Sequence, residues 1–237
     1  MTDVHQVTNF YQTNRQYWRE LSAFQSEQCS YMLNFGFWPN GIVSLGDAQI
    51  EFIKLVKEKI GHPLTEKNSQ GLEIGCGIGG VSIYLLKTNP ALSMTGLDIV
   101  QSQLNIAETN ATLAGVGDRF QTQQGSSMAL PLTDAVFDFS VCIESSFHYE
   151  DKLKFFQEVF RVTKPGGVAV IADITCTDLN ALRFKDSHFF ESPAAYIGFA
   201  EKAGFDVLSQ EDIGVSVFPQ LYQHILNYNH TQARTRE

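Results

Sequence analysis

The sequence lacks a hydrophobic run long enough to cross a membrane. No apolar stretch of the 237 residues approaches the roughly 18 residues that a membrane-spanning helix needs. Residues 1–20 are polar and lack the apolar centre of a secretory signal. We therefore expect a cytoplasmic protein without a membrane partner.

Basic residues are also scarce. The chain has 17 Lys and Arg residues against 26 Asp and Glu residues, for a formal net charge of −9. An acidic surface repels phosphate backbones, and no cluster of Lys and Arg interrupts it, so nucleic acid is not an expected partner.

Metal-binding and disulfide patterns are missing as well. Cys29, Cys76, Cys142 and Cys176 are far apart and form no CxxC pair, and the histidines form no i, i+4 pair. Isolated cysteines in or beside apolar runs are typical of reduced, buried thiols. The sequence predicts neither disulfides nor a metal site.

What the chain does contain, from residue 70 onward, is an alternation of strand-like and helix-like segments. We predict strands at 71–74, 92–98, 120–124, 136–143, 168–174 and 205–212, with helices at 80–87, 102–113, 151–162 and 192–203. Such alternation indicates an α/β fold: a doubly wound, mostly parallel, Rossmann-like sheet with helices on both faces. After residue 212 the apolar spacing is helical, so no seventh strand is expected, and the predicted sheet has an open edge or needs a partner.

Residues 1–69 differ from the rest because they are rich in aromatic side chains and read as helical. Apolar residues between 47 and 60 recur close to a helical period. We therefore divide the chain into a helical N-terminal lid, residues 1–69, and a cofactor-binding domain, residues 70–237.

The most informative segment is the glycine-rich run at 72–80, which leaves a strand and enters a helix. Gly75 and Gly77 fit the dinucleotide pattern G-x-G-x-x-G, so a nicotinamide-dependent oxidoreductase is one interpretation. Glu73, two residues before the first glycine, is poorly placed for a pyrophosphate and well placed for an ammonium group. Asp98 ends the next strand and suits ribose hydroxyls in either interpretation.

Five segments together decide between these interpretations. Residues 72–80, 96–99, 125–131, 137–144 and 161–167 resemble, in order and spacing, the motifs of class I S-adenosylmethionine-dependent methyltransferases. The resemblance implies S-adenosyl-L-methionine as cofactor and a small-molecule acceptor. Ser126 stands where this family usually has an Asp beside the adenine, which removes a charge-assisted hydrogen bond. The cofactor residues that the resemblance implies are Glu73, Gly75, Cys76, Gly77, Asp98, Ile99, Gln103, Ser126, Ser127, Met128 and Glu144.

The segment 144–149 is the candidate for the chemistry. It resembles the E-S-x-x-H stretch of methyltransferases that act on tocopherols and on sugars of natural products. His148 is the candidate general base for an O-methylation, because an imidazole titrates near neutral pH. Asp173 matches a second acidic position and could orient His148 or hold an acceptor hydroxyl. A wall residue and a strand-end carboxylate are the alternatives for these two side chains.

Residues 31–39 resemble a segment that covers the cofactor in the same relatives, and we expect Trp38 to contact the cofactor. The other aromatic residues expected to seal the cleft are Tyr11, Trp18, Tyr31, Phe35, Phe184, Phe189, Phe190 and Tyr196.

Three functional hypotheses remain from the sequence. The first is methyl transfer to a small molecule, on oxygen in preference to nitrogen or carbon. The oxidoreductase would need a catalytic set such as Tyr-x-x-x-Lys, which the sequence does not contain. A cofactor-binding module without turnover is the third. The sequence indicates neither the acceptor nor the oligomeric state.

Overall fold

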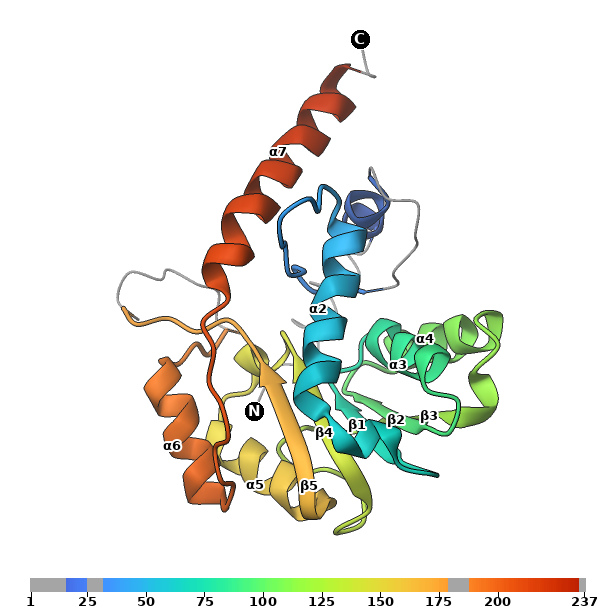
Figure 1. Cartoon of the computed structure of the whole chain (residues 1–237), viewed down its shortest axis with the longest axis vertical. Coiled ribbons are helices and arrows are strands. Elements are labelled where there is room, and N and C mark those ends of the chain that lie inside the picture. Colours follow the sequence, from blue (N-terminus) through green and yellow to red (C-terminus); the bar gives the residue numbers. More distant parts are fainter. Residues whose placement is uncertain (1–15, 25–31, 179–187, 235–237) are drawn as a thin grey trace.

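A parallel sheet organises the chain. The computed structural model describes residues 16–24, 32–178 and 188–234. Five strands lie in the order β3-β2-β1-β4-β5, every neighbouring pair parallel (Figure 1). They are β1 (Gln70–Ile74), β2 (Ser93–Asp98), β3 (Phe120–Gln124), β4 (Phe137–Ile143) and β5 (Thr163–Ala172).

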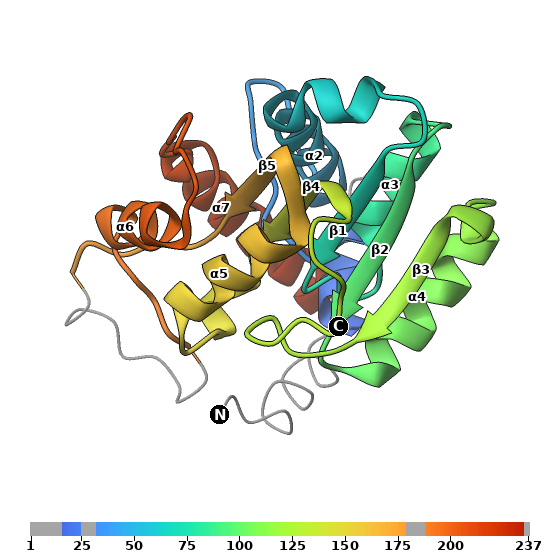
Figure 2. The ribbon, with the colours of Figure 1, turned by 90° about the horizontal axis from the view of Figure 1, so that it is seen from below.

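Helices cover both faces of this sheet (Figure 2). One face packs against α2 (Leu45–Ile60), α3 (Gly80–Thr88) and α4 (Gln101–Leu113), the other against α5 (Lys152–Val162) and α6 (Pro193–Ala203). Strand β4 contributes side chains to both faces, because side chains alternate across a strand. Val141 belongs to the apolar cluster under α2, α3 and α4, whereas its neighbour Cys142 belongs to the cluster under α5 and α6. The predicted doubly wound α/β fold is confirmed.

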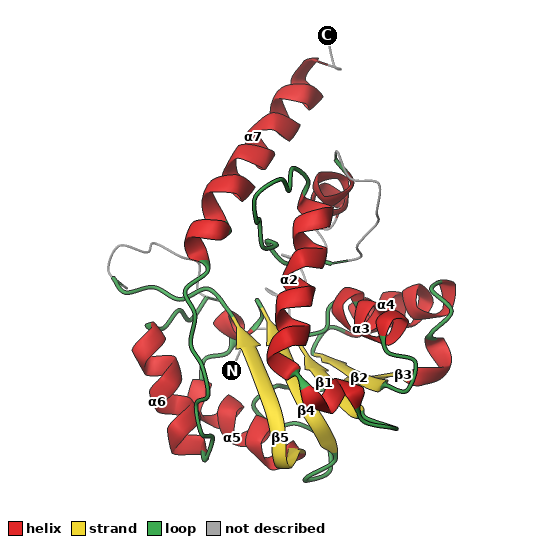
Figure 3. Cartoon of the chain, in the orientation of Figure 1, coloured by secondary structure: helices red, strands yellow, loops and turns green. Residues whose placement is uncertain are grey.

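The predicted sixth strand is wrong. Residues 205–213 form no strand, although Phe205 and Val207 alternate with polar residues as a strand would (Figure 3). Phe205 packs on the α5–α6 cluster and Ile213 on the α2–α4 cluster, while Leu208 between them is 86% exposed. The segment is thus fixed at both ends by side chains and makes no hydrogen-bonded ladder with β5, so in the described part of the chain β5 is an edge strand.

Strand β5 begins earlier than predicted. The register between β4 and β5 jumps from Phe137↔Thr163 to Phe139↔Val168, so the Lys-Pro-Gly-Gly turn expected before the strand is accommodated inside it as an irregularity. Pro165 lacks an N–H group, which an edge strand tolerates. Lys164 Nζ donates to Asp138 Oδ1 at 2.6 Å and holds the turn against β4.

The N-terminal region packs on the last helix, α7 (Phe218–Arg234), which projects from the body (Figure 1). Residues 16–23 and α2 are helical, as expected for 1–69, whereas 32–44 are irregular. His224 of α7 lies between two backbone carbonyls, Nε2 3.0 Å from Leu21 O and Nδ1 3.2 Å from Val43 O. Among the described residues, no helix is long and apolar enough to span a bilayer.

Candidate functional site

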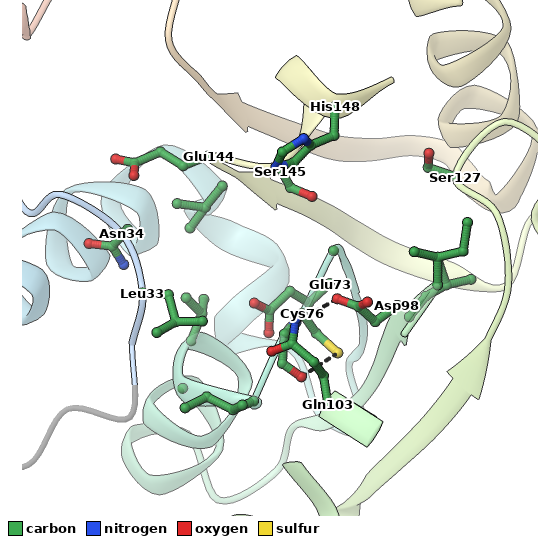
Figure 4. Close-up of a pocket in the computed structure, with 18 of the residues that line it drawn as sticks. Leu33, Asn34, Glu73, Cys76, Asp98, Gln103, Ser127, Glu144, Ser145 and His148 are labelled. Carbon is green, nitrogen blue, oxygen red and sulfur yellow. Dashed lines mark hydrogen bonds between the residues drawn. The ribbon is translucent and has the colours of Figure 1, made fainter. Parts of the chain in front are cut away.

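A cavity opens at the carboxyl ends of β1, β2 and β4, where the strand order reverses (Figure 4). This is the position at which doubly wound sheets bind their ligands. Strand ends supply most of its wall, and irregular residues 32–34 supply one side. The sequence-predicted residues that line it are Glu73, Gly75, Cys76, Gly77, Asp98, Ile99, Gln103, Ser126, Ser127, Met128, Glu144 and His148.

Gly75 makes the turn at the end of β1 possible. Its φ of +74° is in the left-handed region, and a Cβ there would lie 2.0 Å from Ser145 Oγ and 2.9 Å from the Tyr149 hydroxyl oxygen. Its N–H donates to Leu97 O at 2.8 Å, which joins the turn to β2. Only glycine meets both the dihedral and the steric requirement.

Glu73 is buried at the floor of the cavity. Its Oε2 accepts hydrogen bonds from the N–H, at 2.9 Å, and the hydroxyl of Ser82 in the first turn of α3. Burial nevertheless raises the pKa of Glu73 to about 8, because desolvation disfavours its charged form more than these bonds favour it. A cation beside this carboxyl group would be strongly favoured.

Asp98 ends β2 and faces the same turn (Figure 4). Its Oδ2 accepts from Gly77 N and its Oδ1 from Val100 N, both at 2.9 Å. Burial raises the pKa of Asp98 in spite of these bonds. Each oxygen keeps a second lone pair, so the carboxylate can still accept two hydroxyl groups of a ligand.

Unpaired polar atoms mark the cavity as a site for a polar ligand. Three buried side-chain atoms lack a hydrogen-bond partner in the described part of the chain: Asn34 Nδ2, Gln103 Oε1 and Ser69 Oγ. The first two belong to residues that line the cavity. Since buried polar atoms are rarely left unpaired, a donor at Asn34 and an acceptor at Gln103 indicate a ligand with both kinds of group.

The loop after β3 closes the side of the cavity opposite Asn34. Ser126 Oγ accepts from Met128 N at 3.2 Å, so this hydroxyl already stabilises the turn, while Ser127 is buried and lines the cavity. Outside the cavity, Arg161 donates to Leu130 O and so anchors the end of the loop.

Glu144 follows β4 with an unusual backbone. Its φ is +46°, and its Oε2 accepts from Phe35 N at 2.9 Å, which connects the strand end to the irregular N-terminal segment. Burial raises the pKa of Glu144 to about 8.

His148 ends a short 3₁₀ turn, Ser146–His148, and only 4% of it is exposed. Its ring centroid lies 4.2 Å from that of Phe147 and 5.1 Å from that of His188. His188 was not predicted: it follows the undescribed residues 179–187, and nothing in its local sequence marks it.

Asp173 does not line the cavity, although it contacts the 3₁₀ turn through Ser146. Its carboxylate accepts from Ser146 Oγ and, at 2.7 Å, from Ile174 N, and the Tyr196 hydroxyl lies 3.4 Å away. Burial raises the pKa of Asp173 to about 6. The geometry therefore connects Asp173 to the turn that carries His148 through Ser146.

Trp38 is an exception to the prediction, because its side chain is not part of the cavity wall. It is 4% exposed, its ring centroid lies 5.4 Å from that of His224, and its Nε1 donates to Phe35 O at 2.9 Å. Packing against α7, which no local pattern reveals, takes the indole away from the cavity. Of the other aromatic residues expected to seal the cleft, Tyr11, Tyr31 and Phe184 lie outside the described residues.

Lys152 is a residue that the sequence analysis missed. It is 3% exposed, and its ammonium donates to Tyr149 O and, at 2.7 Å, to Phe189 O. Burial lowers the pKa of Lys152 to about 8. This buried cation joins the end of the His148 turn to the segment after residue 187, and a lysine in the first turn of an amphipathic helix gives no sign of it.

Comparisons with known proteins agree with this geometry. Residues 72–171 match the family described as "Methyltransferase domain". Erythromycin 3''-O-methyltransferase of Saccharopolyspora erythraea is 34% identical over 147 residues, which are 62% of this chain and 47% of that protein. Ajmaline N-methyltransferase of Rauvolfia serpentina is 26% identical over 154 residues, 62% of this chain and 53% of that protein.

A solved structure extends the likeness to nearly the whole chain. Geranyl diphosphate C-methyltransferase from Streptomyces coelicolor A3(2), crystallised with Mg²⁺, geranyl diphosphate and S-adenosyl-L-homocysteine, superposes with a TM-score of 0.70 over 93% of both chains. At 13% identity this likeness shows the fold alone. The chain spans about half the length of the two relatives compared by sequence.

Proposed function

We propose that this chain, whose residues 72–171 form a methyltransferase domain, transfers a methyl group from S-adenosyl-L-methionine to a small-molecule acceptor. The observation that carries the proposal is the cavity at the β1–β4 switch point, with two buried carboxyl groups and two unpaired polar atoms on its wall.

The residues present fit this cofactor. Glu73 lies where a carboxylate can receive the ammonium of the amino-acid end, and Asp98 can accept the ribose hydroxyls. The unpaired Gln103 Oε1 offers a further acceptor, and Ser127 with Met128 borders the place for the base. A net positive ligand is favoured because no Lys or Arg lines the cavity in the described part of the chain.

The cofactor, when bound, supplies a methyl group on a sulfonium, which an acceptor atom attacks in line. The chain's own residues then need to align the acceptor and exclude water. The turn at 144–149 and the irregular residues 32–34 border the cavity and suit both tasks.

O-methylation with His148 as base is the finer part of the proposal. His148 lines the cavity, so its imidazole can accept a proton from an acceptor hydroxyl. Asp173 acts as a positioning residue, because it holds Ser146 and thereby the turn that ends at His148. Relatives named for methylation at O, N and C all resemble this chain, so nitrogen and carbon acceptors are the competing possibilities.

Calorimetry tests the cofactor. We expect S-adenosylhomocysteine to bind and NAD not to bind; the reverse result would contradict the proposal and favour the oxidoreductase. A screen with a labelled methyl donor against phenols, sugar hydroxyls and secondary amines then tests turnover. Cofactor binding without transfer to any acceptor class would favour the non-catalytic module.

The pH dependence of the His148→Gln variant tests the base. With a hydroxyl acceptor we expect kcat to fall about 100-fold, within the usual range for general bases, and its rise with pH near neutrality to disappear. Phe147→Leu, which changes the adjacent ring and not the imidazole, is the control. An unchanged rate and profile in the Gln variant would refute the role.

A further inference from the structure

The irregular residues 32–38, which we call the strap, lie over the glycine turn. Leu33 Cδ1 is 3.7 Å from the position that a Cβ of Gly77 would take. Leu33 and Asn34 lie on the side of the cavity opposite Ser127, and the Asn34 side chain turns its nitrogen toward the cavity (Figure 4).

Asn34 uses only half of its amide within the protein. Its Oδ1 accepts from Gly36 N at 3.0 Å, whereas Nδ2 is buried without a partner in the described part of the chain. The residue is 4% exposed, so bulk water does not satisfy this donor. An unpaired buried donor is costly, and a ligand that accepts from it would gain correspondingly.

The position of this donor is fixed by contacts that do not involve it. Gln49 Nε2 donates to Asn34 O at 2.7 Å and to Met32 O at 3.2 Å, and Gln49 Oε1 accepts from Ser22 Oγ at 2.9 Å. Phe35 N, the next donor along the strap, is bound to Glu144. The strap therefore presents the Asn34 amide in a defined place before any ligand arrives.

Charge in the cavity leaves one part of the cofactor without an evident partner. Glu73, Asp98 and Glu144 are acidic and suit an ammonium and hydroxyl groups, but the amino-acid end also carries a carboxylate. That carboxylate needs donors, and among the described residues no Lys or Arg lines the cavity.

We propose that Asn34 Nδ2 donates a hydrogen bond to the carboxylate of the cofactor's amino-acid end, which makes Asn34 a specificity-determining residue for ligands that keep this group. The inference rests on the proposed function, because it takes S-adenosylmethionine as the ligand. It adds a residue from the strap to a site otherwise built by strand ends.

Two ligands that differ only in the carboxylate test the proposal. Titration calorimetry would compare S-adenosylhomocysteine with its decarboxylated analogue, 5′-deoxy-5′-(3-aminopropylthio)adenosine. For the wild-type chain we expect the analogue to bind at least tenfold more weakly, as for loss of a hydrogen bond to a charged group. A difference under threefold would overturn the assignment without any variant.

Asn34→Asp sharpens the test, because it keeps the oxygen that accepts from Gly36 N and replaces the donor by a second oxygen. We expect this substitution to lower the affinity for S-adenosylhomocysteine at least tenfold and to change the affinity for the decarboxylated analogue by less than twofold. Equal weakening of both ligands would mean that Asn34 only shapes the strap, and no weakening of either would mean that the amide makes no ligand contact.

Gln49→Leu is the matched control for the strap. It removes the bonds that hold Asn34 O and Met32 O without changing the Asn34 side chain. Because these bonds position an amide that the analogue does not use, binding of S-adenosylhomocysteine should weaken more than binding of the analogue, but by a smaller factor than in Asn34→Asp. If the wild-type chain bound neither ligand, the proposed cofactor would be wrong. If it bound both equally, only the role of Asn34 would be wrong.

Discussion

The two ends of the cavity are built differently. At the end where we propose the cofactor, most of the wall comes from the ends of β1, β2 and β3 and the turns after them, within residues 73–128. At the proposed acceptor end, the turn at 144–149 is supported by Asp173 and by residues after 187. The strap, which comes from before β1, contacts both ends, at the glycine turn and at Glu144. A site made of consecutive strand ends can be recognised from local motifs, whereas a site assembled from distant segments depends on packing that local motifs do not encode.

The largest expected effect is at Gly75. Gly75→Ala puts a Cβ 2.0 Å from Ser145 Oγ at a φ of +74°, so the turn must move. We expect S-adenosylhomocysteine affinity to fall more than 100-fold by calorimetry. Gly115→Ala is the control, since Gly115 has a φ of +72° and nothing within 4 Å of the added Cβ. It should cost only about 1 kcal/mol of backbone strain and leave binding unchanged. Similar affinities in the two variants would show that the glycine turn does not form the cofactor end.

The next effect tests whether the acceptor end is independent of the cofactor end. Asp173→Asn weakens the partly buried bonds to Ser146 and Tyr196, at a cost of about 2 kcal/mol. For a chain of this size the melting temperature should fall by roughly 4–8 °C. Affinity for S-adenosylhomocysteine should stay within twofold.

Asp138→Asn provides the comparison for Asp173, because it also removes a carboxylate at one end of a strand, but at the start of β4 and away from the cavity. It should lower the melting temperature less. A tenfold loss of cofactor affinity in Asp173→Asn would mean that the two ends are one unit.

A smaller effect is expected from the titration of Glu73. The pKa of Glu73 is about 8 in the free protein, so the side chain is mostly protonated at pH 6.5. An ammonium ligand favours the carboxylate, so binding should release a proton and affinity should rise about tenfold between pH 6.5 and 8.5. Calorimetry in two buffers of different ionisation enthalpy measures this proton.

Glu73→Gln should remove both the proton release and the rise of affinity with pH. Glu144, whose pKa burial also raises to about 8, is the alternative source of such a proton. If Glu73 is the source, Glu144→Gln should retain the rise of affinity with pH. If the rise of affinity with pH disappeared with Glu144→Gln and persisted with Glu73→Gln, the ammonium would belong beside Glu144, after β4, and not beside Glu73 in β1.

The smallest effect is expected at Ser126, where the family resemblance places an adenine contact. The Ser126 hydroxyl already accepts a hydrogen bond from Met128 N. Removal of this hydroxyl should therefore lower the affinity for S-adenosylhomocysteine only two- to threefold. Calorimetry of Ser126→Ala, with Ser127→Ala beside it, measures this. More than tenfold weakening would show that Ser126 replaces the usual acidic residue in full.

The sequence was sufficient to expect which residues after β1 and β2 share a cavity, and insufficient elsewhere for physical reasons. Glu73, Gly75 and Asp98 lie at or directly after the ends of β1 and β2. That these three residues come close together in space could therefore be expected from the order of the strands alone. The structure places Trp38 outside the cavity wall, because its side chain packs against His224, 186 residues later in the chain. The strand expected at 205–212 begins with a short, mostly apolar run but lacks a hydrogen-bonded neighbour, and an apolar run alone does not supply one.

The acceptor end could be predicted only as a set of residue types. His148 could be identified in the sequence as a titratable group that follows a strand. The roles of Ser146 and Lys152 could not: Ser146 connects Asp173 to the turn that carries His148, and Lys152 binds two backbone carbonyls. Both depend on segments that meet only in three dimensions.

Strap and C-terminal helix are joined where Trp38 N donates to Ser216 O at 2.8 Å, two residues before α7 begins. Helix α7 is thereby connected to the strap over the proposed cofactor site. An environment-sensitive dye attached at Tyr222, which is 64% exposed, should thus change its emission when the site is filled, and would give this chain a reporter that needs no acceptor.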